Sequence, residues 1–159
     1  MSGKKISVVV PCFNEELNIP MLYNEVKSQV PSQYTVEFIF VDDGSSDSTL
    51  SVLKKLKAEN ANVFFISFSR NFGHQNALKA GIDHASGDCV ISMDADLQHP
   101  PHLIPQLIEA WEQGYDVVYT VRNDSGDESF FKKMTSRMFY SIINSLSTTR
   151  IEPGAADFR

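Results

Sequence analysis

The strongest constraint on the fold is a repeated alternation between short, β-branched apolar runs and longer segments with apolar residues at helical spacing. The runs have the length and composition of buried strands. Each is followed by a helical segment, and consecutive parallel strands require such a crossover. The order therefore predicts an α/β domain with a mostly parallel sheet and right-handed connections. The expected strands are residues 6–10, 36–41, 63–68, 89–93 and 117–121.

Capping residues indicate where the expected helices begin and end. Asn18 is placed to cap the first helix, and Ser45 or Ser46 to cap the second. A fourth helix is expected to begin at Pro101 and to stop at Gly114. The wide apolar face of residues 130–146 is most simply explained as part of the core.

Bulk composition limits the class of protein. A chain of 159 residues is most simply one domain, and its formal charge of −6 argues against a nucleic-acid backbone as the main partner. Cys12 and Cys89 lie in or beside expected strands without metal-ligand spacing, which indicates reduced core thiols. The first residues lack the features of a secretory signal, and no segment reaches the ~20 apolar residues of a membrane helix. We therefore expect a soluble, cytoplasmic polypeptide.

Two acids follow the fourth expected strand at the point where its apolar run stops. Asp94 and Asp96 are two residues apart, so their side chains leave an extended chain on the same face. Paired carboxylates repel unless they share a proton or bind a cation, and Mg²⁺ or Mn²⁺ accepts such oxygen ligands. This pattern favours a divalent metal that in turn binds a diphosphate. An arbitrary pair of this kind is more often a solvated cap, so the neighbouring strand ends decide between the two interpretations.

Polar residues also follow the other expected strands. Asn14 and Glu15 come after the first, Asp42 and Asp43 after the second, and Arg122 after the fifth. Since ligands of open α/β sheets bind outside the carboxyl ends of the strands, these groups are candidates for one site. Asp42 is placed to accept hydrogen bonds from a base or ribose, whereas turn chemistry explains Asp43 equally well.

The third strand adds a weaker candidate for anion binding. Arg70 and the exposed amides before the following helix could serve an anion, although Arg70 and His74 are more often simple surface groups. The first strand-to-helix turn carries no Gly-x-Gly-x-x-Gly, so phosphate must be bound in another way.

Four ordered motifs resemble those of the family 2 glycosyltransferases, which have the GT-A fold. They are similar in particular to the dolichol-phosphate mannosyltransferase and bactoprenol glucosyltransferase branch. The motifs are Val-Val-Val-Pro-Cys-Phe-Asn-Glu-Glu at 8–16, Val-Asp-Asp-Gly-Ser-Ser-Asp at 41–47, Ser-Arg-Asn-Phe-Gly-His at 69–74 and Met-Asp-Ala-Asp-Leu-Gln-His-Pro at 93–100. The resemblance implies a Rossmann-like three-layer sandwich and the transfer of a sugar from a UDP- or GDP-sugar with inversion at the anomeric carbon.

The resemblance also implies roles for individual residues. Asp94 and Asp96 match the metal-binding Asp-x-Asp, with Gln98 as a further ligand of Mg²⁺ or Mn²⁺ and Asp96 at the catalytic centre. Arg122 matches an arginine near the phosphates. The residues expected around the nucleotide sugar are Pro11, Asn14, Glu15, Asp42, Asp94 and Arg122.

On the acceptor side, Asp157 falls where many relatives place an acid. It is expected to act as general base if the acceptor is a glycan hydroxyl. A polyprenyl phosphate would already be ionised near pH 7, because the second pKa of a phosphate monoester is ~6, and Asp157 would then position it. This chain lacks the second basic residue that many lipid-phosphate relatives carry after Arg122, unless Lys132 or Lys133 replaces it.

We expect residues 1–122 to form the core that binds the nucleotide sugar, and residues 123–159 to form a mobile loop, a helix and the start of the acceptor side. The chain is expected to be the catalytic portion of a longer protein, which would then act at the cytoplasmic face of a membrane. Two alternatives stay open: a Mg²⁺-binding phosphoacceptor domain with a regulatory role, and a nucleotide-sugar binding module without catalysis.

Overall fold

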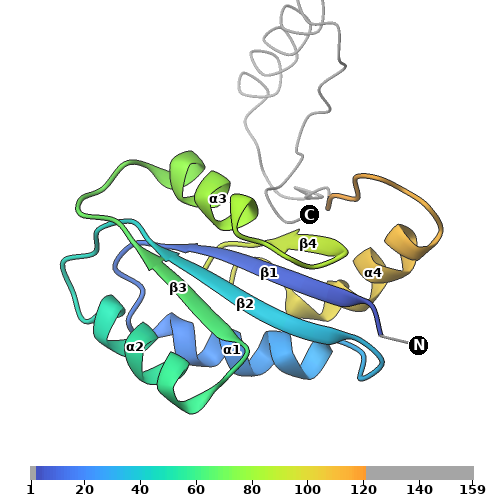
Figure 1. Cartoon of the computed structure of the whole chain (residues 1–159), viewed down its shortest axis with the longest axis horizontal. Coiled ribbons are helices and arrows are strands. Elements are labelled where there is room, and N and C mark those ends of the chain that lie inside the picture. Colours follow the sequence, from blue (N-terminus) through green and yellow to red (C-terminus); the bar gives the residue numbers. More distant parts are fainter. Residues whose placement is uncertain (1–2, 121–159) are drawn as a thin grey trace, which may run out of the picture. The chain divides into compact units, whose positions relative to one another are not determined.

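The computed structural model describes residues 3–120, and these form a four-stranded parallel sheet with helices on both faces (Figure 1). The spatial order of the strands is β3-β2-β1-β4, so β1 is central and the chain reverses direction across the sheet between β3 and β4. The strands are β1 (Lys5–Cys12), β2 (Thr35–Asp42), β3 (Val63–Ser67) and β4 (Cys89–Ser92).

Helices α1, α2 and α4 cover one face of the sheet, and α3 covers the other (Figure 1). The alternation of side chains along β1 explains this division. Val8 and Val10 belong to the core cluster shared with α1, α2 and α4, whereas Val9 packs with Ala77 and Leu78 of α3. The helices are α1 (Asn18–Gln29), α2 (Thr49–Glu59), α3 (His74–Asp83), the 3₁₀ turn η1 (Pro101–Leu103) and α4 (Ile104–Glu112).

The strand registers bring several polar residues to one edge of the sheet. Cys12 on β1 lies opposite Asp42 on β2, which lies opposite Ser67 on β3, so three strands end at the same level. On the other side of β1, the Met93 amide donates to the carbonyl of Val9 at 3.1 Å. The residues that follow β4 therefore emerge beside those that follow β1, as parallel strands require.

A buried polar cluster fastens the opposite edge. The carboxylate of Glu37 on β2 accepts hydrogen bonds from Lys5 and Ser7 on β1 and from Ser86 before β4. Burial alone would raise the pKa of Glu37, but these bonds outweigh it and lower the pKa from 4.5 to about 2. The charged carboxylate thus connects three segments near the amino ends of the strands, away from their carboxyl ends.

The four helix–strand units confirm the predicted α/β class, but the predicted fifth strand is wrong within the residues described. Residues 117–120 are not assigned to a strand, and β4 is paired with β1 alone in the described part of the chain. Val117 is 68% exposed, although Val118 packs against the core. Valine-rich sequence fits a pleated, half-buried surface, and a valine as exposed as Val117 does not lie on such a surface.

Two of the predicted caps are also wrong. Asn18 is the first residue of α1 rather than its cap, and its side-chain amide donates to Glu15 at 2.7 Å. Helix α2 begins only at Thr49, because Ser45 and Ser46 are bonded to Asn14 instead. Among residues 3–120, no helix has both the length and the apolar character that a membrane crossing requires.

Candidate functional site

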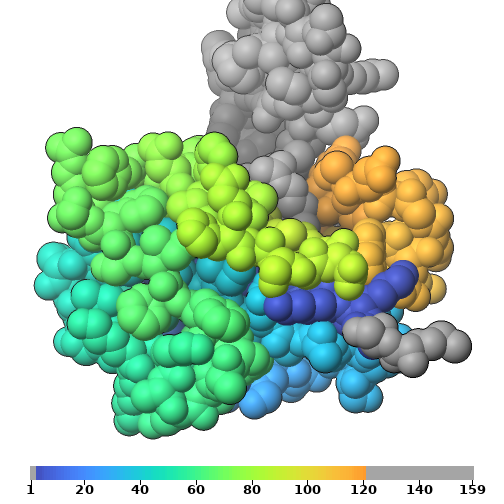
Figure 2. Space-filling view, in the orientation of Figure 1, coloured from blue at the N-terminus to red at the C-terminus, as the bar shows by residue number. Residues whose placement is uncertain are grey.

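A cavity of about 290 Å³ opens where β1, β2 and β4 end and α3 begins, and we call it the strand-end cavity. Its lining comes from four separate segments of the chain, all at the carboxyl edge of the sheet. In the space-filling view the green to yellow-green atoms of α3 lie toward the upper left, and the orange residues near 115 lie at the right (Figure 2). The lining residues are Pro11, Cys12, Phe13, Glu15, Asp43, Asn71, His74, Ala77, Asp94, Ala95 and Asp96.

Asp94 and Asp96 both line this cavity, as the sequence predicted for paired acids after a strand. Ala95 between them is only 3% exposed, which anchors the segment in the core. Asp96 is exposed, and its Oδ1 accepts the backbone amide of Gln98 at 3.0 Å. That bond closes a local turn around Leu97, whose φ is 60°. The turn leaves Gln98 exposed and outside the cavity lining.

Two histidines contact Asp94, and sequence reasoning gave neither of them a role. His74 Nε2 lies 2.8 Å from Asp94 Oδ1, so Nε2 must carry the proton because a carboxylate only accepts. The Asp94 amide donates to His99 Nδ1 at 3.1 Å, which places the His99 proton on Nε2, 3.8 Å from Asp94 Oδ2. The position of His74 directly after Gly73, at a helix start on the ligand-binding edge, was the signal that could have identified it.

Asn14 has a structural role that the sequence did not predict. Its side-chain oxygen accepts the Ser46 amide at 2.8 Å, and its own amide donates to the hydroxyl of Ser45 at 2.9 Å. Its φ of 58° is in the left-handed region that asparagine tolerates better than most residues. Asn14 therefore joins the loop after β1 to the loop after β2, and it is not among the residues that line the cavity.

The neighbouring acids Asp42 and Asp43 have different surroundings. Asp42 is 2% exposed, and its carboxylate accepts the Ser45 amide and the Ser67 hydroxyl, both at 3.0 Å. It does not line the cavity, whereas Asp43 does. The Asp43 carboxylate also accepts the amides of Phe72 and Gly73, at 2.7 and 2.9 Å. Asp43 thus fixes the segment before α3, while Asp42 supports the turn from inside.

The strand-end cavity is strongly acidic. Its lining holds four carboxylates and, among the described residues, neither a lysine nor an arginine. Burial, with the negative charges of Glu15 and Asp42, raises the pKa of the Cys12 thiol well above its ordinary value. An anionic ligand such as a diphosphate would therefore need a cation beside it.

The chemistry of the donor set fits Mg²⁺ or Mn²⁺. Both ions prefer oxygen ligands, and Mg²⁺ is commonly bound by one or two carboxylates, with substrate phosphates and water completing the coordination. The carboxylates of Asp94 and Asp96 supply that number from one turn. Within residues 3–120 no group of three or more His, Cys, Asp or Glu side chains forms a complete protein cage for a metal. The predicted positions Arg122 and Asp157 lie outside the described residues.

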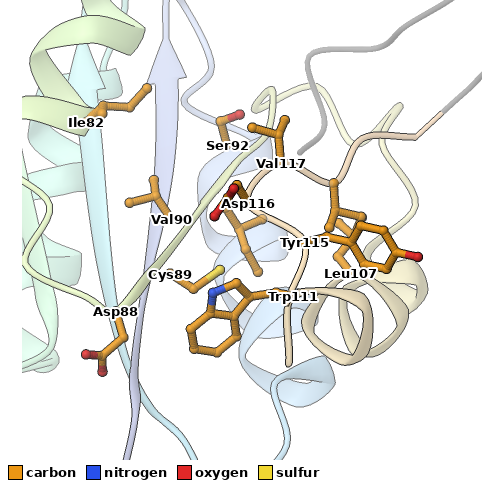
Figure 3. Close-up of a pocket in the computed structure, with 12 residues that line it drawn as sticks. Ile82, Asp88, Cys89, Val90, Ser92, Leu107, Trp111, Tyr115, Asp116 and Val117 are labelled. Carbon is orange, nitrogen blue, oxygen red and sulfur yellow. The ribbon is translucent and has the colours of Figure 1, made fainter. Parts of the chain in front are cut away.

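A second cavity, of about 340 Å³, runs along the outer edge of β4 (Figure 3). Its lining is mostly apolar, and Trp111 of α4 and Cys89 of β4 lie in it. Burial raises the pKa of the Cys89 thiol, which makes it a poor nucleophile. Asp88 and Asp116 are its charged residues, and they belong to neither of the paired-acid motifs. This sheet-edge cavity therefore lacks the converging polar groups of the strand-end cavity.

Comparison with known proteins identifies the family. The profile described as Glycosyl transferase family 2 matches residues 7–159. The chain belongs to this family. It is 47% identical over 156 residues to the bactoprenol glucosyl transferase of Shigella phage SfV, covering 98% of this chain and 51% of that protein. It is 44% identical to the prophage bactoprenol glucosyl transferase homolog of Escherichia coli K12, with 98% and 51% coverage.

Solved structures are similar to this chain in fold. Residues 1–349 of TarS from S. aureus match with a TM-score of 0.61 and 24% identity, over 79% of this chain and 38% of that one. The mannosyltransferase PcManGT of Pyrobaculum calidifontis, solved with GDP-Man and Mn²⁺, matches with a TM-score of 0.61 and 23% identity, over 75% and 36%. The fold is the GT-A fold of glycosyltransferases, as the sequence motifs implied. The chain spans about half the length of the curated relatives that it matches.

Proposed function

We propose that this chain forms the sugar-donor half of an inverting glycosyltransferase that uses a UDP- or GDP-sugar. The observation that carries the proposal is the shared position of Asp94 and Asp96 in the strand-end cavity, beside residues that follow β1 and β2. Family membership supports it, as do relatives named bactoprenol glucosyl transferases. A TarS structure in complex with UDP-GlcNAc and the PcManGT complex supply examples of donors bound by the same fold.

In this proposal Asp94 and Asp96 hold Mg²⁺ or Mn²⁺, and Gln98 adds an oxygen ligand if its side chain turns toward the cavity. The ion would neutralise charge on the departing nucleoside diphosphate without proton transfer. The two carboxylates would determine where the diphosphate binds, because they hold the cation. The rest of the cavity lining is acidic and would repel a diphosphate without a cation. Asp96, the more exposed of the two, is the one we place nearest the reacting centre.

The nucleoside is assigned to the segments after β1 and β2. Pro11 and Glu15 line the cavity and are proposed to contact the base or ribose directly. We assign Asn14 and Asp42 an indirect part, since their side-chain oxygens are already bonded to the loop of Ser45 and Ser46. Arg122 is proposed to lie near the phosphates.

For the acceptor we propose a polyprenyl phosphate, with a glycan hydroxyl as the alternative. The names of the bactoprenol relatives favour the lipid. Asp157 would position an already ionised phosphate, or deprotonate a hydroxyl as general base. A lipid acceptor would bring the whole protein to the cytoplasmic face of a membrane and connect it with cell-surface polysaccharide synthesis.

The test is donor turnover by the chain itself. With UDP-glucose or GDP-mannose and Mn²⁺, we expect slow release of the sugar. NMR then identifies the anomer that forms first. The inverted anomer would support the proposal. Asp83→Asn is the matched control for Asp96→Asn, because Asp83 is an exposed acid at the far end of α3. Binding without any metal-dependent turnover would favour a nucleotide-sugar binding module, and an aspartyl phosphate formed from a small phosphodonor would favour the phosphoacceptor alternative.

A further inference from the structure

Asp94 is held by a side chain from another element, which goes beyond the pairing of two acids. His74 is the first residue of α3, and Asp94 follows β4, twenty residues later in the chain. Their side chains meet at 2.8 Å inside the strand-end cavity. Both side chains are partly exposed, at 42% and 35%, so neither is forced into place by burial alone. The hydrogen bond from His74 therefore orients Oδ1 of the Asp94 carboxylate, while Oδ2 lies 3.8 Å from His99 Nε2.

We propose that His74 is a positioning residue for Asp94, and this inference rests on the proposed function. Nε2 of His74 occupies one lone pair of Asp94 Oδ1 and fixes rotation of the carboxylate about its Cβ–Cγ bond. The remaining lone pairs are then presented to a cation in a fixed direction. Hydrogen-bonded partners of metal-ligating carboxylates act in this way, and their loss typically lowers metal affinity by 10–100-fold.

The backbone on both sides of the pair is fixed independently. The Gly73 amide donates to Asp43 Oδ2 at 2.9 Å, which places the start of α3 relative to the end of β2. The Asp94 amide donates to the buried His99, which places the start of the acidic turn. His74 and Asp94 thus meet through two anchored backbones, so the bond orders the carboxylate rather than the loops.

The experiment measures Mn²⁺ binding by calorimetry or by electron paramagnetic resonance, with UDP present and without any sugar transfer. His74→Leu removes the donor, and His74→Gln keeps an N–H near the position of Nε2. We expect His74→Leu to weaken Mn²⁺ binding by about 10–100-fold and His74→Gln to stay within about threefold of wild type. His84→Gln is the matched control, since His84 is exposed at the other end of the same helix.

Each outcome supports or overturns the inference. Wild-type Mn²⁺ affinity in His74→Leu would overturn the positioning role and leave the proposed function intact. A lowered melting temperature with unchanged Mn²⁺ affinity would show a merely structural role and also overturn it. No Mn²⁺ binding by the wild-type protein would overturn this inference together with the metal-assisted part of the proposed function. Loss in His74→Leu with recovery in His74→Gln would support it.

Discussion

The side-chain oxygen of Asn14 accepts the backbone amide of Ser46 at 2.8 Å and so joins the loops that follow the two central strands. Asn14 reaches this partner with a φ of 58°. The same loops carry Glu15 and Asp43, which line the strand-end cavity. The position of these cavity residues therefore depends on a contact between two loops that are thirty-two residues apart.

Substitution at Asn14 should separate the hydrogen bond from the backbone conformation. Asn14→Gly loses the bond but accepts a positive φ, whereas Asn14→Ala loses the bond and adds strain. We expect Asn14→Ala to lower the free energy of unfolding by about 2 kcal/mol and Asn14→Gly by roughly half of that. Urea denaturation measures both. Equal losses of unfolding free energy in the two variants would contradict a contribution from the backbone conformation. No loss in either variant would contradict a stabilising role for the hydrogen bond between Asn14 and Ser46.

Gly44 is required by its surroundings as well as by its φ of 70°. A Cβ at this position would lie 2.6 Å from the Cα of Arg70, and backbone atoms of Arg70 and Asn71 close the space further. We expect Gly44→Ala to destabilise the fold by roughly 3 kcal/mol or more, because backbone cannot move aside as a flexible side chain can. Gly114→Ala, with a φ of 97° and open space around it, should cost only about 1–2 kcal/mol. Similar melting temperatures for the two variants would disprove the steric argument.

Acid should weaken the fold through Glu37. Its pKa in the folded protein is about 2, below the ordinary 4.5, so the charged form is favoured in the folded state. The resulting stability is fully present above pH 4.5 and is lost as the pH falls toward 2. Its size is about 3 kcal/mol at neutral pH.

The matching measurement compares wild type with Glu37→Gln in urea at a series of pH values. The difference in unfolding free energy between them should shrink as the pH is lowered through this window. A difference that stays constant would mean that the carboxylate of Glu37 gains nothing from Lys5, Ser7 and Ser86.

The thiol of Cys12 should resist alkylation in the folded protein. It is 2% exposed, and burial together with the charges of Glu15 and Asp42 raises its pKa well above the ordinary value. Cys89 is partly exposed, and its pKa is raised by burial alone. Iodoacetamide at mildly alkaline pH should modify Cys89 first, and both residues in denaturant, as read by mass spectrometry. Faster modification of Cys12 would show that the strand-end cavity is more open than described.

The four strands of the sheet and the acidic edge could be predicted because they depend on local sequence. Apolar runs such as residues 36–41 specify buried strands by themselves, and the change to acids at Asp94 marks a strand end. The common edge then follows from the parallel order alone. Apolar composition was less informative for residues 117–120, which are not assigned to a strand, because a strand residue fits a half-buried surface and Val117 is 68% exposed.

The individual roles within the site could not be read from the sequence because they depend on long-range contacts. Asn14 is expected at the nucleotide, and no sequence pattern indicated that its side-chain oxygen also accepts the amide of Ser46 in the next loop. Nothing in the composition of α3 indicates that His74 reaches Asp94. Of the adjacent acids, Asp42 and Asp43, only the fold determines which one lines the cavity.

The central claim is that the paired acids couple a divalent cation to the diphosphate of a nucleotide. The most direct measurement is the affinity for UDP and for GDP by calorimetry, with and without Mn²⁺, in wild type, Asp96→Asn and the control Asp83→Asn. We expect Mn²⁺ to raise the affinity of wild type and of Asp83→Asn for one of the two nucleotides on the order of tenfold or more. The nucleotide affinity of Asp96→Asn should stay nearly the same with and without Mn²⁺. An equal Mn²⁺ enhancement in Asp96→Asn would contradict the claim.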